Sequence, residues 1–320
     1  MLWLTWRQHR WQVIGVAAVL AGYTGYLVYA GLTLRHAIAT CPESFGAAPV
    51  PASCRTGMDV MNAVHNRMTD VVLLGNLLPL AVGMFWGAPL IARELEQGTY
   101  RLAFTQSVSR RHWLLTKLAV LSAAAALLGA LDGAAVTWAY AGLSGFADRP
   151  FGNTLTFSQS GVVPAATWVF ALLAGVTLGL VSRRTMTTVA VTLVALPLVF
   201  LGLVVVRPHY LPPAVHVVDG AHMTPDPPIS NSAQGWVFRV SYVDSKGTGL
   251  DSAAAGGVCA DPGSTFPTAA CLDRTGLRQR IVLQPADRYV WFQLIEAGLL
   301  LGASGAMVVF LRRRIGGRLV

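Results

Sequence analysis

The chain has 320 residues, with 24 Lys and Arg against 15 Asp and Glu and a formal net charge of +9. Apolar residues make up 54% of the chain and charged residues only 12%, whereas a soluble domain carries about 25% charged residues. This composition excludes a pair of ordinary soluble domains and indicates a membrane protein. The basic residues lie beside apolar runs rather than along a polar domain, so we expect no nucleic-acid partner.

Apolar runs of membrane-crossing length predict six transmembrane helices. They lie at about residues 13–34, 71–92, 118–143, 164–181, 186–206 and 289–311. Pro79 and Pro89 interrupt the second run and Pro197 the fifth, and proline inside a helix removes a backbone hydrogen bond. The first run is too long for the apolar core of a signal peptide.

The segments outside these runs differ in character. Residues 1–12 mix three Trp with two Arg, a pattern typical of an interfacial helix on the bilayer surface. Residues 35–70 and 144–163 are interpreted as polar loops. Residues 207–288 hold nine of the 17 prolines, and within them residues 236–243 are aromatic and β-branched, which predicts a strand.

The distribution of basic residues predicts the orientation. Four segments on one side of a six-helix topology hold 13 Lys and Arg in 50 residues. These segments are residues 1–12, 93–117, 182–185 and 312–320. The opposite side holds 11, of which seven lie in the long segment 207–288, and long loops are discounted in this comparison. We therefore expect both termini and residues 93–117 to be cytoplasmic.

Four cysteines form two close pairs, Cys41 with Cys54 and Cys259 with Cys271. Both pairs fall on the predicted outer side, where disulfides persist. We expect the two disulfides Cys41–Cys54 and Cys259–Cys271, with cross-pairing between the loops or four free thiols as the alternatives. Each bond would close a loop of about a dozen residues and contribute about 2–3 kcal/mol by the chain-entropy estimate.

Residues 93–117 are a charge-dense segment between two apolar runs. Glu94 and Glu96 lie where a helix leaves an anionic membrane face, which disfavours them. A protein partner that binds them would account for their presence, and a solvated loop is the alternative. Arg110 follows Ser109, a plausible N-cap, and begins a helix.

Two further carboxylates, Asp132 and Glu296, lie inside predicted helices. A charge at mid-bilayer costs about 2.5–3.5 kcal/mol on insertion scales, so such residues face the bundle interior or a cavity. A polar contact along a substrate path or at a dimer interface is one interpretation. A protonated or hydrogen-bonded structural residue is the other, and we favour it slightly.

Several short patterns carry a family resemblance. They are Arg93-Glu94-Leu95-Glu96-Gln97-Gly98-Thr99, Leu102, Thr105-Gln106-Ser107-Val108-Ser109-Arg110 and Lys117, with Thr5-Trp6-Arg7-Gln8-His9-Arg10 near the start and Gln284-Pro285-Ala286-Asp287-Arg288 before the last helix. Together they resemble the permeases of ABC-2 type transporters, in particular actinobacterial subunits that work with a separate ATP-binding protein. The Glu-x-Gly-Thr part is the most specific.

The resemblance implies a coupling helix in residues 93–117 that docks on an ATPase subunit. Its contact or hinge residues are Glu94, Glu96, Gly98, Thr99, Leu102 and Arg110. It also implies a homodimer or heterodimer of permeases bound to two ATPase subunits in a bacterial plasma membrane. ATP and Mg²⁺ would be bound by that partner, so we expect no cofactor in this chain.

The chain's own motifs agree with a non-enzymatic role. A Walker A loop requires Gly-Lys-Ser/Thr, and the only two lysines follow Thr116 and Ser245. The histidines and aspartates of residues 209–226 match no defined ligand spacing, so we expect no metal site.

The sequence thus predicts an all-α polytopic membrane protein with six transmembrane helices and cytoplasmic N- and C-termini. A small, disulfide-containing, partly β extracellular module would lie between the fifth and sixth helices. The favoured function is the permease subunit of an ATP-driven exporter of a hydrophobic or amphipathic substrate. The alternative is a membrane sensor or scaffold that binds an external ligand through residues 207–288 without transport.

Overall fold

The structure of the protein is a computed structural model. It describes residues 2–40, 54–97, 110–141, 151–219, 231–232, 235–244, 247–259 and 267–316. The chain divides into two compact units. The helical unit comprises residues 1–142, 158–208 and 292–320, and the β unit comprises residues 143–157 and 209–291.

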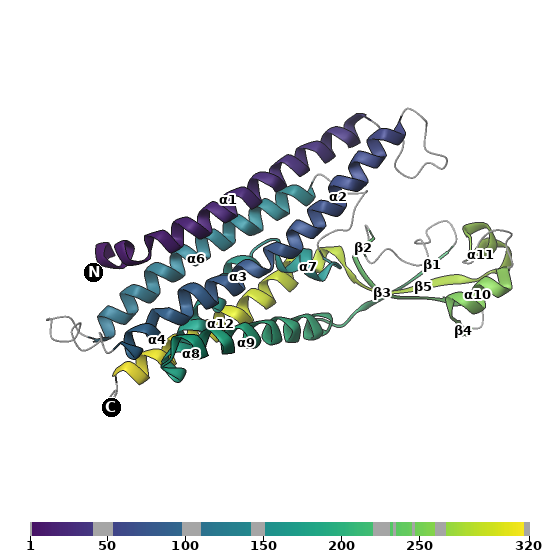
Figure 1. Ribbon diagram of the computed structural model, residues 1–320. Helices are drawn as coiled ribbons and strands as arrows, with labels where there is room; N and C mark the ends of the chain where they lie inside the picture. The colour runs from purple at the N-terminus through teal and green to yellow at the C-terminus, as the bar shows by residue number, and fades with distance from the viewer. Residues whose placement is uncertain are drawn as a thin grey trace. The chain divides into compact units, whose positions relative to one another are not determined.

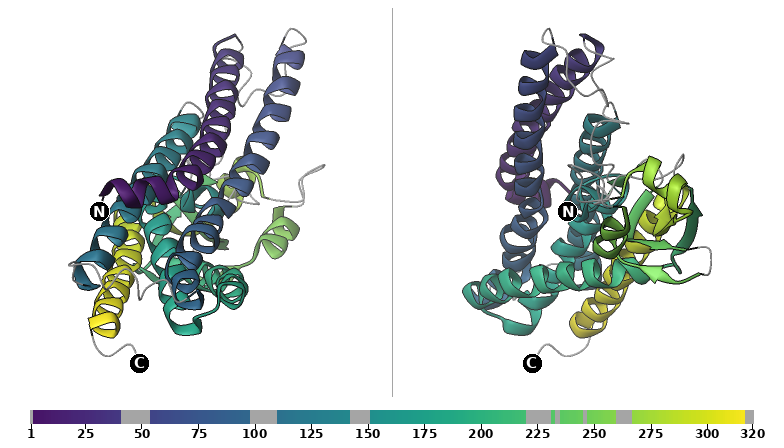
Figure 2. Two further views of the ribbon diagram at one scale, coloured as in Figure 1. Left: turned by 60° about the vertical axis from the view of Figure 1, so that its left-hand side comes forward. Right: turned by 90° about the vertical axis from the view of Figure 1, so that its right-hand side faces the viewer.

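Among the described residues, six helical segments are long and apolar enough to cross a membrane, which confirms the predicted number. They are α1 (Leu2–Thr40), the run α2 (Arg55–Gly75), α3 (Leu77–Val82), η3 (Gly83–Gly87) and α4 (Ala88–Glu96), then α6 (Arg110–Ala141), α8 (Val163–Ser182), α9 (Thr185–Val206) and α12 (Tyr289–Gly316). In Figure 1 the start of α1, the end of α4, the start of α6 and the end of α12 lie at the same end of the helical unit. The first turns of α1 run at an angle to the rest of the helix (Figure 2).

The second helical segment is longer than predicted. It runs from Arg55 to Glu96, about 63 Å at 1.5 Å per residue, against a hydrocarbon core of about 30 Å. The prediction of a loop over residues 35–70 is therefore wrong at both ends, because α1 continues to Thr40 and α2 begins at Arg55. The early part of α2 is amphipathic: Met61 and Met68 are buried on one face, a helical period in the sequence.

A π-helical turn, η3, marks the predicted proline interruption. The backbone N–H of Ala88 donates to the carbonyl of Gly83, five residues earlier. Pro89 has no N–H to continue the normal ladder, so the widened turn lies directly before it. The helix therefore continues through Pro89 with a local shift in its backbone hydrogen bonding.

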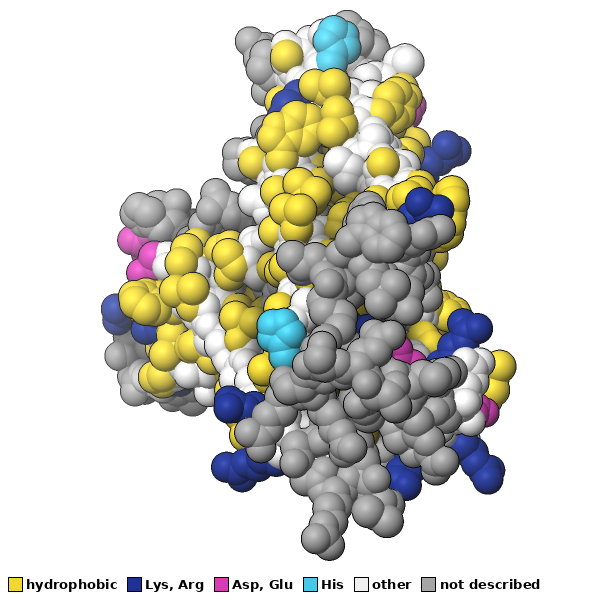
Figure 3. Space-filling model, turned by 90° about the vertical axis from the view of Figure 1, so that its left-hand side faces the viewer, with side chains coloured by type: hydrophobic (Ala, Val, Ile, Leu, Met, Phe, Trp, Pro, Cys, Tyr) yellow, Lys and Arg dark blue, Asp and Glu magenta, His cyan; other side chains and the backbone are white. Residues whose placement is uncertain are grey.

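Helix α8 lies at the centre of the helical unit. In the most apolar 18-residue stretch of this helix 67% of the residues are buried, against 11% in the corresponding stretch of α9. Trp86 and Trp168 are both nearly fully buried in the main hydrophobic cluster, to which α6 contributes Leu114 and Leu118. Hydrophobic side chains remain exposed along the outer faces of the helices (Figure 3), as expected for a bundle that faces lipid.

Glycines allow the close approach of α8 to its neighbours. A Cβ on Gly83, Gly87 or Gly175 would clash with backbone atoms across the η3–α8 contact, and one on Gly129 would meet Trp168 and the carbonyl of Pro164. Such small-residue contacts are a common basis of helix packing in membranes. Gly298 on α12 is also followed by a glycine four residues later, as Gly83 is, but a Cβ on Gly298 would meet nothing within 4 Å.

The turn between α8 and α9 follows the prediction for residues 182–185. Helix α8 ends at Ser182, and Arg183 adopts the left-handed conformation with φ of 55°. That conformation ends a helix without a glycine at some energetic cost. Helix α9 then begins at Thr185.

The β unit contains an antiparallel sheet with the order β1-β5-β3-β2, and β4 pairs with β3. Its strands are β1 (Ala214–Val218), β2 (Asn231–Ser232), β3 (Gly235–Val243), β4 (Gly249–Leu250) and β5 (Arg278–Pro285). The predicted strand over residues 236–243 is thus confirmed as β3. Short helices α10 (Ser252–Cys259) and α11 (Ala269–Thr275) lie between β4 and β5, and the short 3-10 helices η4 (Arg207–His209) and η6 (Ala286–Arg288) flank the sheet segments in sequence.

A segment interpreted as a plain loop belongs to this unit. Within residues 144–163, helix α7 (Thr154–Ser158) is capped by Asn153, whose Oδ1 accepts the N–H of Leu155 at 3.1 Å. The ring of Phe151 packs on Trp236 and Tyr289, with centroids 5.9 and 5.8 Å apart. Aromatic packing, which spacing alone did not indicate, therefore attaches this segment to the sheet.

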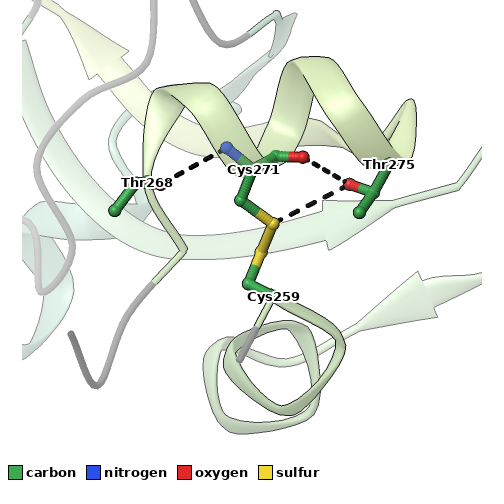
Figure 4. Close-up of a disulfide and its surroundings, with 4 residues drawn as sticks. All are labelled: Cys259, Thr268, Cys271 and Thr275. Atoms are coloured by element: carbon green, nitrogen blue, oxygen red, sulfur yellow. Dashed lines mark hydrogen bonds between the residues drawn. A yellow bond between two sulfur atoms is a disulfide. The ribbon is translucent and has the colours of Figure 1, made fainter. Parts of the chain in front are cut away.

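The disulfide Cys259–Cys271 is present, as predicted, and joins α10 to α11 with 5.6 Å between the Cα atoms. Figure 4 shows it beside Thr268, whose Oγ1 accepts the backbone N–H of Cys271 at 3.3 Å and caps α11. Cys54 directly precedes α2, but Cys41 lies outside the described residues. The Cys41–Cys54 bond therefore stays a prediction.

The glycine contacts around α8 generate a stability prediction. Gly175→Ala places a methyl group against the carbonyl of Gly83 and the amide of Ala88, and overpacking of this kind costs about 1–3 kcal/mol. We expect a lower midpoint of thermal unfolding, measured on the purified protein in detergent. Gly298→Ala is the matched control and should leave the midpoint unchanged or slightly raised, because alanine favours the helix. Equal effects of the two changes would contradict the packing.

Candidate functional site

Glu94 and Lys117 join α4 and α6, the two helices on either side of the predicted coupling segment. Glu94 lies in the last turns of α4 and Lys117 in the first turns of α6. The Lys117 Nζ donates to Glu94 Oε1 at 2.6 Å, and the two side chains are 6% and 25% exposed. A mostly buried, charge-assisted bond is stronger than an exposed pair. This bond holds the end of α4 next to the start of α6.

Glu96 makes a second link at the same end of the helical unit. Its Oε2 accepts the backbone N–H of Thr185 at 3.0 Å, at the start of α9. A carboxylate there satisfies a backbone donor that has no partner within the helix and interacts favourably with the helix dipole. The end of α4 is thus tied to both α6 and α9, and the two predicted contact carboxylates have partners within the chain.

The other predicted coupling residues are less fully described. Helix α6 begins at Arg110, as predicted, but its side chain is not among those described. Gly98, Thr99 and Leu102 lie outside the described residues. The structure therefore describes the frame of this segment, meaning the end of α4 and the start of α6, and not residues 98–109.

Glu296 belongs to a buried ion pair. The Arg207 guanidinium donates from Nε to Glu296 Oε2 and from Nη2 to Oε1, both at 2.7 Å. Both side chains are at most 3% exposed, and Arg207 also donates to Ser158 Oγ at 3.0 Å. This two-bond geometry satisfies both oxygens and is the strongest form of the pair. Glu296 is thereby a structural link between α12 and the end of α9.

Gln293, one turn before Glu296, makes a further link from α12. Its Oε1 accepts the backbone N–H groups of Val162 and Val163 at 3.1 and 3.2 Å. These are among the first amides of α8, which lack partners within the helix. Two polar side chains of α12 therefore attach it to α8 and α9.

Asp132 differs from these paired groups. It is fully buried in α6, and neither carboxylate oxygen has a hydrogen-bond partner. The indole N–H of Trp168 lies next to the carboxylate, and Tyr23 lies within electrostatic reach of it. Neither group makes a hydrogen bond of good geometry, so each also lacks a partner. Three unpartnered polar groups thus lie together between α1, α6 and α8.

Comparison with known families shows to which family the chain belongs. A family model described as "ABC-2 membrane transporter related" matches residues 17–207, well over half of the chain. The chain belongs to this family. Comparison with curated proteins and with solved structures gave no significant match.

Membership in this family confirms the resemblance to ABC-2 type permeases, whereas the actinobacterial origin and the separate ATP-binding partner stay predictions. Members of this family are membrane components of transporters and are not themselves the ATPase. The matched region contains Glu94, Glu96, Asp132 and Lys117, and it ends at Arg207. Residues 209–291 of the β unit and all of α12, with Glu296, follow the matched region, whereas residues 143–157 of the β unit lie within it.

The functional contacts that sequence reasoning missed are the partners of the predicted carboxylates. Lys117 was included in the charged segment without a role, and Arg207 was assigned to the start of the long insertion. A basic residue at the end of an apolar run could have indicated Arg207 as a partner for Glu296. No comparable signal in the sequence links Glu94 to Lys117, because they come from separate helices 23 residues apart.

The buried pair generates a prediction about stability. Glu296→Gln leaves the Arg207 charge buried without its counter-ion, a change that costs about 3–5 kcal/mol in comparable pairs. We expect a clear fall in the unfolding midpoint in detergent. The double variant Arg207→Met/Glu296→Leu should recover most of it, since an apolar pair of similar volume is tolerated. A single variant as stable as the wild type would contradict a structural role.

Proposed function

We propose that the chain is the permease subunit of an ATP-driven exporter, and that an ATPase subunit docks on the segment between α4 and α6. Family membership over residues 17–207 is the observation that carries this proposal. Motion of a docked segment would reach the bundle through Glu94–Lys117 and Glu96–Thr185, which join α4 to α6 and α9. The transported substrate would be hydrophobic or amphipathic.

This arrangement changes the role proposed for the two carboxylates. Glu94 and Glu96 act within the chain, because each already holds a group of a neighbouring helix. The coupling segment itself, with Gly98, Thr99, Leu102 and Arg110, would supply the contacts with the ATPase. A rigid frame is required for such transmission, since a docked segment on loose helices would move without moving the bundle.

The remaining parts of the assembly follow from the family. We infer a multi-pass protein of a bacterial plasma membrane, with cytoplasmic termini, a second permease subunit and two ATPase subunits. Conversion between inward- and outward-facing states requires a free-energy difference that nucleotide binding by the ATPase can supply. ATP and Mg²⁺ belong to that partner.

A second function is favoured by one specific observation. The sheet and the disulfide of the β unit lie outside the matched region, in residues 209–291. A sensor or scaffold that binds an external ligand through this unit would use it without transport. Deletion of residues 214–283 distinguishes the two functions, because a transporter should keep ATPase binding whereas a sensor should lose its ligand.

A charge exchange tests the frame around the coupling segment. Glu94→Gln and Lys117→Gln should each lower the ATP hydrolysis of the co-purified complex by about fivefold, the equivalent of one lost bond of about 1 kcal/mol. The exchanged variant Glu94→Lys/Lys117→Glu should restore most of the activity. If Glu94→Gln alone weakens co-purification and the exchange does not restore it, Glu94 contacts the ATPase directly.

The orientation has its own test. A cysteine at Gly98, in a background where the four native cysteines are serine, should be inaccessible to a membrane-impermeant maleimide in intact cells and accessible after lysis. A cysteine at exposed Arg239 in β3 is the matched control and should be labelled in intact cells. Labelling of the Gly98 site from outside would overturn the proposed coupling to a cytoplasmic ATPase.

A further inference from the structure

Asp132 is the exception among the buried charges of the helical unit. Arg207 is paired with Glu296, and Lys117 is paired with Glu94. Asp132 is as deeply buried as these groups, yet neither of its oxygens has a partner. An ionised carboxylate in an apolar interior is strongly disfavoured unless a positive group neutralises it. The described part of the chain supplies no such group to Asp132.

The neighbours of Asp132 suit a small organic cation. Tyr23 on α1 provides an unpartnered hydroxyl oxygen, and the Trp168 indole on α8 provides an aromatic ring. An ammonium group has three donors, which the two carboxylate oxygens and a hydroxyl oxygen can accept. Aromatic faces also attract cations. No group of three His, Cys, Asp or Glu side chains in the described chain could hold a metal ion, so a metal site is not indicated.

Tyr23 is a half-buried residue of α1. Its ring is partly exposed on the surface of α1, whereas its hydroxyl is buried. Gly75, the last residue of α2, leaves room for that hydroxyl, because a Cβ there would lie 2.6 Å from it. Tyr23 therefore packs against Gly75 on α2, and it lies within electrostatic reach of Asp132 on α6.

We propose that Asp132, Trp168 and Tyr23 form a binding site for the primary ammonium group of an amphipathic molecule. Asp132 neutralises the charge, the Tyr23 hydroxyl accepts a hydrogen bond, and the Trp168 indole N–H lies beside the carboxylate. In the exporter this makes cationic amphiphiles a substrate class. That physiological role rests on the proposed function, whereas binding by the chain alone does not.

The test measures thermal unfolding of the purified chain in phosphatidylcholine nanodiscs with decylammonium chloride, with decanol and with sodium chloride. Saturating decylammonium should raise the midpoint by about 5 °C, and decanol and sodium chloride should not. Asp132→Asn should abolish the rise. Asp70→Asn, which removes an exposed carboxylate from α2, is the matched control and should keep it.

A second variant protects the test against a folding failure of Asp132→Asn. Tyr23→Phe removes only the hydroxyl and should weaken decylammonium binding about fivefold, measured by titration of the midpoint. Nanodiscs that contain phosphatidylethanolamine should raise the starting midpoint only if a lipid amine, rather than a free amphiphile, occupies the site. An equal rise with decanol, or an undiminished rise in Asp132→Asn, would overturn the proposal. ATPase binding is not needed for any of these measurements, so failure of the proposed function would show separately.

Discussion

Pairing of polar groups inside an apolar bundle is the constraint on which the helical unit depends. Lipid cannot satisfy a buried charge or a free backbone donor. Arg207 and Glu296 satisfy each other, and Gln293 accepts two backbone donors at the start of α8. These bonds form only in one arrangement of α8, α9 and α12, so they select the arrangement as well as stabilise it. Apolar packing against lipid-like surfaces would be far less selective.

The helices themselves could be predicted from the sequence because each needs only its own residues. Length and hydropathy of the runs determined six helices, and the ends of the fourth and fifth runs located the α8–α9 turn to within a residue. The amphipathic start of α2 was overlooked because it falls below the hydropathy of a membrane span, although Met61 and Met68 show its period. Hydropathy detects the membrane part of a helix and not its extension beyond it.

The contacts within the candidate site could be predicted only in part. The sequence identified Glu94, Asp132 and Glu296 as unusual, because charged residues are rare in or beside membrane-crossing apolar runs. Their outcomes differ because the partner is decided by helix packing: Glu296 meets Arg207 from a helix 89 residues earlier, and Asp132 meets none. The β sheet is a similar case. Strand β3 is evident from its residues, but its pairing with β5 is a long-range contact that local pattern does not determine.

The glycines around η3 and α8 show how this packing could also permit motion. Gly83, Gly87 and Gly175 bring backbones into contact at the π-helical turn η3, directly before α4. Such π-helical turns inside α-helices are frequent at functional sites. The paired carboxylates lie at the end of this same segment and tie it to α6 and α9. A force applied between α4 and α6 would therefore reach a segment that meets α8 backbone to backbone beside a π-helical turn.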